Sequence, residues 1–120
     1  MSGRAMELNL DGKRFRSVSN TANGEVGAET TFLYRQHGDI ITATYSGGLI
    51  VYGHLLGRML PDGQIDFRYH HLNERGELMA GTCQSTPKRT PEGRLRFVES
   101  WRWFSGDGSS GESEIEEVAP

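Results

Sequence analysis

Glycine-containing turn signals recur along this chain at the spacing of β-hairpins. Each signal separates short runs that are rich in Thr, Ile, Val, Phe, Tyr and Trp. Glycine adopts positive φ at no steric cost, so such signals favour the tight turns that join antiparallel strands. A spacing of roughly ten residues predicts an all-β sandwich or barrel. The signals are His37-Gly38, Gly47-Gly48, Pro61-Asp62-Gly63, Arg75-Gly76, Glu92-Gly93 and Gly106-Asp107-Gly108.

The runs between the turns predict about eight strands in a single domain. No segment of the 120 residues sustains apolar residues at helical spacing. Consecutive hairpins make an antiparallel up-and-down meander, which closes into a barrel and so removes its exposed edges. A barrel of this size is filled by side chains or holds one small ligand. We expect residues 1–12 to be a weakly ordered leader and residues 13–120 to be the barrel domain. The expected strands are 13–20, 28–36, 39–46, 49–60, 64–72, 77–86, 94–104 and 110–118, with a bulge near Gly53 or Gly57.

Composition argues against several classes of partner. With 13 basic and 16 acidic residues the net charge is −3, which gives no reason to expect binding to nucleic acid or to an anionic membrane. The chain shows no signal peptide and no apolar run of the ~20 residues that span a bilayer. Cys83 is the only cysteine, and as a small packed side chain it fits a reducing compartment. We therefore expect a soluble, cytoplasmic protein without a cofactor.

The segment 94–104 contains the most informative alternation. Leu95, Phe97, Trp101 and Trp103 share one face, whereas Arg94, Arg96, Ser100 and Arg102 share the other. Glu99 falls in the middle of the apolar face. A carboxylate in that position is costly unless it is hydrogen-bonded, paired or reached by water. The pattern predicts that Glu99 points into the barrel, where desolvation raises its pKa unless a cation compensates.

Hairpin register extends this prediction to a candidate pocket. A four-residue turn over Asn73 to Gly76 pairs Tyr69 with Ala80 and places Ala80 beside Glu99. Equivalent reasoning pairs Tyr34 with Ile41, and Arg102 with Glu112. The residues expected to line one ligand-binding pocket are Tyr69, His71, Glu99 and Trp101. Two alternatives remain open: a structural hydrogen bond from Glu99 to Tyr69 or His71, and a register in which Glu99 lies outside.

Other reactive residues form no recognisable site. His70 and His71 are adjacent on an expected strand, so they point to opposite faces and do not readily share a metal. His37 belongs to a turn, and no Cys or carboxylate cluster has ligand spacing, so we predict no metal site. No Gly-x-Ser-x-Gly elbow or catalytic cysteine signature occurs.

Several local strings together resemble a known family. The strings are Ala43 to Gly48, Arg68 to His71, Glu99 to Trp103, Ser110 to Ser113 and Ile115 to Glu117. They are similar to a family of small bacterial proteins often labelled N-acetylglutamate synthase, over roughly Lys13 to Val118. The label implies acetyl transfer, for which acetyltransferases use an Arg/Gln-x-x-Gly-x-Gly/Ala loop that opens a helix. The nearest string, Arg35 to Ile40, lacks the last small residue and runs into an expected strand, so the residues disfavour that activity. The meander itself is similar to avidin-like and lipocalin-like barrels.

The sequence favours a small β-barrel that binds a small apolar or aromatic ligand in its interior. One alternative is a barrel enzyme, an isomerase, lyase or hydrolase, that uses Glu99 with His71 or Tyr69 as acid and base. Another is a structural or oligomer-forming module with a filled interior. An enclosed, partly polar cavity favours binding or catalysis, whereas a close-packed interior favours the structural role. The sequence does not indicate an oligomeric state.

Overall fold

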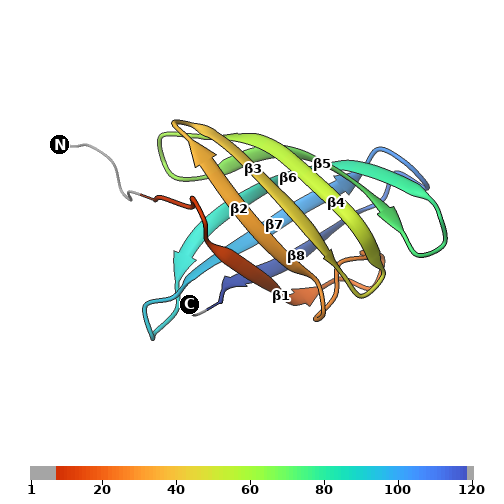
Figure 1. Cartoon of the computed structure of the whole chain (residues 1–120), viewed down its shortest axis with the longest axis horizontal. Coiled ribbons are helices and arrows are strands. Elements are labelled where there is room, and N and C mark those ends of the chain that lie inside the picture. The colour runs from red at the N-terminus through yellow and green to blue at the C-terminus, as the bar shows by residue number, and fades with distance from the viewer. Residues whose placement is uncertain (1–7, 119–120) are drawn as a thin grey trace.

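The computed structural model describes residues 8–118, which form a closed antiparallel barrel (Figure 1). Each strand pairs with the next along the chain, and the last pairs with the first. The predicted fold class, an eight-stranded meander that closes on itself, is therefore confirmed. The strands are β1 (Arg14–Asn20), β2 (Thr31–His37), β3 (Ile40–Gly47), β4 (Ile50–Met59), β5 (Ile65–Asn73), β6 (Leu78–Arg89), β7 (Leu95–Trp103) and β8 (Ser110–Glu117).

The alternation of strand direction gives the barrel two different ends. The β1–β2, β3–β4, β5–β6 and β7–β8 connections meet at one end, which we call the mouth. The other three connections meet at the opposite end, which we call the floor, and the chain enters and leaves there (Figure 1). Within the stretch expected to be a leader, residues 1–7 lie outside the described residues. Leu10 is fully buried in the barrel core, and the backbone N–H of Gly12 donates to the carbonyl of Tyr34 at 2.9 Å.

Aromatic side chains fill the floor half of the barrel. Phe15, Tyr34 and Phe97 are fully buried, and the ring centroid of Phe15 lies 5.0 Å from that of Tyr34 and 5.5 Å from that of Phe97. Edge-to-face and tilted contacts at this separation are favourable for aromatic rings. The predicted inward face of β7 is confirmed, because Leu95, Phe97, Glu99, Trp101 and Trp103 are all buried.

Two strand glycines leave space for the aromatic rings of their register partners on the neighbouring strand. A Cβ atom at Gly53 would overlap the ring of Tyr45, and one at Gly81 would overlap the ring of Tyr69. Glycine within a strand often marks such a close approach. The register shift in β4 lies between Ile50 and Tyr52, just before Gly53 and well away from Gly57.

The β5–β6 register differs by one residue from the predicted one. Tyr69 pairs with Gly81 rather than with Ala80, so the inward residues of β6 are Gly81, Cys83 and Ser85. The cause is the turn, which is one residue longer than expected. The Asn73 side-chain oxygen accepts hydrogen bonds from the backbone N–H groups of Arg75 and Glu77, both at 3.0 Å, and so stabilises the longer loop. A one-residue shift exchanges the two faces of a strand. The expected position of Ala80 beside Glu99 is therefore wrong.

Two other predicted registers are wrong by two residues, which leaves the faces unchanged. Tyr34 pairs with Ala43 rather than Ile41, because the β2–β3 turn is centred on Gly38 and Asp39. Arg102 pairs with Ser110 rather than Glu112, because the β7–β8 hairpin is centred on Gly106 rather than on Asp107.

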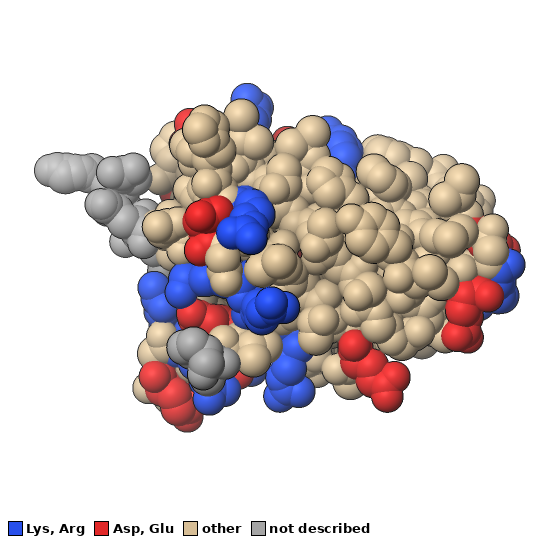
Figure 2. Space-filling view, viewed as in Figure 1, with Lys and Arg blue, Asp and Glu red and all other residues tan. Residues whose placement is uncertain are grey.

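Charge is distributed unevenly over the outside. In the view of Figure 2, Lys, Arg, Asp and Glu gather mainly toward the floor end, and a broad area over β3 and β4 is uncharged. Val51, Tyr52 and Leu56 are among the exposed apolar residues of β4. On the β7–β8 surface, Arg96 forms ion pairs with Glu114 and Glu116. Residues 8–118 contain no helix that is long and apolar enough to cross a membrane.

Candidate functional site

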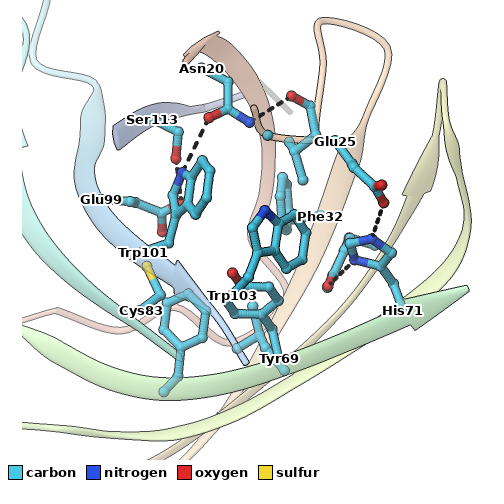
Figure 3. Close-up of a pocket in the computed structure, with 15 residues that line it drawn as sticks. Asn20, Glu25, Phe32, Tyr69, His71, Cys83, Glu99, Trp101, Trp103 and Ser113 are labelled. Atoms are coloured by element: carbon cyan, nitrogen blue, oxygen red, sulfur yellow. Dashed lines mark hydrogen bonds and ion pairs between the residues drawn. The ribbon is translucent and has the colours of Figure 1, made fainter. Parts of the chain in front are cut away.

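The mouth half of the barrel contains a cavity of about 50 Å³ (Figure 3). A water molecule needs about 10–15 Å³, so the cavity has room for a few waters and is smaller than the roughly 150 Å³ of a cavity that holds benzene. Its walls are predominantly apolar, and Asn20, Glu25, His71, Glu99 and Ser113 add polar groups. The aromatic rings that line it are Phe32, Tyr45, Phe67, Tyr69, Trp101 and Trp103.

All four residues that the sequence singled out lie on this cavity. Tyr69 and His71 are alternate residues of β5, and Glu99 and Trp101 are alternate residues of β7. The strand period of two directs each pair toward the interior. The structure thus brings Tyr69, His71, Glu99 and Trp101 together, and their role in binding a ligand remains a prediction.

Glu99 is a buried carboxyl group held by two serine hydroxyls. Only 6% of the residue is exposed. The Ser85 hydroxyl donates to one carboxyl oxygen at 2.5 Å, and the Ser113 hydroxyl donates to the other at 3.4 Å. Ser85 and Ser113 are the register partners of Glu99 on β6 and β8. Among the described residues, the hydrogen bonds of Glu99 therefore go to these two serines. The alternative of a structural hydrogen bond from Glu99 to Tyr69 or His71 would require a contact that residues 8–118 do not make.

Burial raises the pKa of Glu99 to about 7, and the two serine hydroxyls oppose this rise only in part. The other acidic groups near Glu99 offer no compensating charge. Burial raises the pKa values of Tyr34, Tyr45, Tyr69 and Cys83, so these groups remain neutral at pH 7. The predicted rise in the pKa of Glu99 through desolvation agrees with this environment.

The two tryptophans form one wall of the cavity and tie it to the end of β1 and the β1–β2 loop (Figure 3). Their ring centroids are 5.5 Å apart in an edge-to-face arrangement. The indole N–H of Trp101 donates to the side-chain oxygen of Asn20, and that of Trp103 donates to the carbonyl of Asn23, both at 3.2 Å. Each buried indole therefore has a hydrogen-bond partner while its apolar surface faces the cavity.

A chain of side chains fixes the β1–β2 loop, residues 21–30, at the mouth. His71 Nε2 lies 2.8 Å from a Glu25 oxygen, and the Tyr45 hydroxyl lies 2.9 Å from His71 Nδ1. Burial lowers the pKa of His71, although Glu25 partly opposes this effect. A neutral imidazole with its proton on Nε2 donates to Glu25 and accepts from Tyr45, so both ring nitrogens are occupied. The same Glu25 carboxylate also accepts from Asn73 and forms an ion pair with Arg75.

Sequence reasoning missed four polar residues of this site. Ser85 and Ser113 needed the correct register of β6 and β8, which depends on turn geometry. Glu25 and Asn20 lie in or next to a polar stretch with no periodicity, and Glu25 reaches partners 46 to 50 positions away. Inward alternation with Ile115 on β8 was the one available signal, and it pointed to Ser113. Within residues 8–118, no group of three or more His, Cys, Asp or Glu side chains has a geometry that could hold a metal ion.

Comparison with known proteins places the whole barrel in one family. No curated protein and no solved structure gives a significant match. A family model described as avidin-like protein matches residues 8–118, which include all eight strands and the loops of the mouth. The match agrees with the avidin-like architecture expected from the sequence. The chain therefore belongs to the avidin-like protein family.

Proposed function

We propose that this protein binds a small apolar or aromatic molecule in the mouth half of its barrel. The observation that carries the proposal is the cavity, which six aromatic rings and one buried carboxyl group line. Binding sites for small molecules are typically concave and apolar, with a few polar groups that fix orientation. Membership of the avidin-like family is consistent with this role.

The geometry suggests how such a molecule is held. A small molecule in the cavity contacts Trp101, Trp103 and Tyr69, while Glu99 and Ser113 offer hydrogen bonds to a polar substituent. The β1–β2 loop contributes Gly24, Glu25 and Val26 to the lining. Glu25 anchors this loop to β5, so release of these contacts would widen the cavity for a ligand as large as a ring.

The two alternative functions have less support. An acid–base enzyme needs a proton donor and acceptor that face a common substrate, but His71 has both ring nitrogens occupied by Tyr45 and Glu25. Glu99 is hydrogen-bonded to serines, and among residues 8–118 no hydrogen bond joins it to His71 or Tyr69. A purely structural barrel has no need for a hollow with a buried carboxyl group, since a filled interior is more stable.

A screen with a blocked variant tests the proposal. Tryptophan fluorescence and thermal melting are recorded with neutral and charged single-ring compounds, because Trp101 and Trp103 report directly on the cavity. The variant Val26→Phe places a larger side chain at the mouth from a loop position, and Ala28→Phe makes a similar change at an exposed position of the same loop. We expect compounds that stabilise the wild type and Ala28→Phe but not Val26→Phe. If no compound changes the melting temperature or the fluorescence of the wild type, the proposal is wrong.

A further inference from the structure

Glu99 is a carboxyl group inside the barrel without a cation. None of the ion pairs recorded among residues 8–118 includes it, and the residues that line the cavity include no Lys or Arg. A buried ionised carboxylate normally requires a paired charge or full hydrogen bonding. The described part of the chain therefore supplies no positively charged partner for an ionised Glu99.

The two serines leave part of the carboxyl group available. The contact from Ser85, at 2.5 Å, has the length of a charge-assisted O–H···O⁻ hydrogen bond. The contact from Ser113 is 3.4 Å long, so the second carboxyl oxygen is held only weakly. Glu99 and Ser113 both line the cavity. An ionised carboxylate only accepts hydrogen bonds, so this second oxygen can receive a donor from a ligand.

The aromatic wall beside Glu99 also favours positive charge. The ring centroid of Trp103 lies 5.5 Å from that of Trp101 and 5.7 Å from that of Tyr69, and all three side chains line the cavity (Figure 3). The faces of aromatic rings attract cations, and the attraction increases when water is excluded. Glu25, the other carboxylate that lines the cavity, is ion-paired with Arg75, so Glu99 is the lining carboxyl group without a cation.

From this arrangement we infer that the ligand is a small organic cation, an ammonium or amidinium group attached to a single ring or a few methyl groups. The inference rests on the proposed function, because it assigns a charge to the molecule that the cavity would hold. Glu99 accepts the N–H donors or faces the charge of the cation, and the rings of Trp101, Trp103 and Tyr69 surround its apolar part.

Proton release accompanies this mode of binding. Below pH 7 most Glu99 carboxyls of the free protein are protonated, because burial raises their pKa to about 7. The groups near Glu99 (Tyr34, Tyr45, Tyr69 and Cys83) are neutral there, and His71 and Glu25 lie at the mouth in contact with each other. A bound cation ionises Glu99 and displaces one proton. The affinity for the cation therefore falls about tenfold for each pH unit below about 7.

Isothermal titration calorimetry with a matched charge series tests the inference. The probes are benzylammonium, its neutral analogue benzyl alcohol, and benzoate, with tetramethylammonium as a cation that lacks a ring. At pH 8 we expect benzylammonium to bind at least tenfold more tightly than benzyl alcohol, and benzoate not to bind. At pH 6, titrations in buffers of different ionisation enthalpy should show close to one proton released per cation bound.

Two variants locate the effect. Glu99→Gln should bring the affinities for benzylammonium and benzyl alcohol to within threefold of each other and abolish proton release. Glu112→Gln, an exposed change on the neighbouring strand β8, should alter neither. If Glu99→Gln does not fold, the pH dependence and the proton release of the wild type still decide the question.

The outcomes separate this inference from the proposed function. If benzyl alcohol or benzoate binds as tightly as benzylammonium, the cavity is a binding site but not a cation site, and the inference is overturned. If cations bind with no proton release and no loss in Glu99→Gln, Glu99 is not their partner, which also overturns it. If neither this series nor the neutral single-ring compounds bind, both the inference and the proposed function are wrong.

Discussion

The substitution Glu99→Gln offers a quantitative test of how the barrel interior treats a charge. Glutamine keeps the shape of the side chain, and its amide can exchange hydrogen bonds with Ser85 and Ser113, whose hydroxyls rotate. The only property removed is ionisation. The variant should therefore fold, and its stability relative to the wild type should depend on pH.

The magnitude follows from the difference between the folded and unfolded states. The pKa of Glu99 is about 7 in the folded protein, against an ordinary value of 4.5 in an unfolded chain. Between these values the folded protein binds more protons than the unfolded chain, so the contribution of Glu99 to stability declines as the pH rises from 4.5 to 7. A difference of this size corresponds to about 3 kcal/mol. We expect Glu99→Gln to gain about 3 kcal/mol on the wild type between pH 4 and pH 8.

Urea unfolding followed by tryptophan fluorescence measures this difference at each pH. The contributions of other titrating groups to stability largely cancel, because both proteins share them. One of these groups is His71, whose lowered pKa makes the folded state lose stability as the pH falls below 6.5. If the difference in unfolding free energy between variant and wild type stays constant within about 0.5 kcal/mol across this pH range, the desolvation argument is refuted. This threshold reflects the error of about 10–15% in extrapolated unfolding free energies. A wild type that gains on the variant with rising pH would mean that a cation pairs with Glu99.

Three further predictions concern packing and the mouth. Trp101→Ala should cost about 3–5 kcal/mol of stability because it removes a buried ring and leaves a cavity. Arg102→Ala, an exposed change on the same strand, should cost less than about 1 kcal/mol. Urea melts that rank the two variants the other way would contradict the observed faces of β7. Gly81→Ala should cost about 1–3 kcal/mol because its Cβ would meet the Arg102 carbonyl oxygen and the Tyr69 ring, whereas Gly27→Ala has open space and should be close to neutral. Equal thermal shifts would argue against this close packing around Gly81. Glu25→Gln should accelerate amide hydrogen exchange in the β1–β2 loop while β7 stays protected, because it weakens the contacts of the loop with β5; unchanged exchange would show that the tryptophan hydrogen bonds suffice to hold the loop.

The sequence predicted the fold because turn chemistry and strand alternation are local properties. The alternation from Leu95 to Trp103 identified the inward face of β7 and the buried position of Glu99 without any knowledge of its partners. All eight expected strands exist, since each is bounded by a turn in which glycine supplies positive φ or by a polar loop. Closure followed from the number of strands and from the cost of leaving edges unpaired.

The surroundings of Glu99 could not be predicted in the same way because they depend on distances across the barrel. A single residue added by the Asn73 turn determines whether Ala80 or Gly81 faces Tyr69, and hence which β6 side chains point inward. The serine partners of Glu99 follow from two further registers, that of β6 with β7 for Ser85 and that of β7 with β8 for Ser113. Glu25 has no periodic context, and only the tertiary structure brings it to His71.

The pairing of β1 with β8 has a practical consequence for handling the protein. The backbone N–H of Val118 donates to the carbonyl of Arg14 at 2.8 Å, so the chain enters and leaves the barrel side by side at the floor. A linker, label or carrier domain attached on the floor side of the barrel therefore lies at the end opposite the cavity. The barrel can therefore be attached to a sensor surface, or joined to another protein, with its mouth directed into solution and its aromatic wall unobstructed.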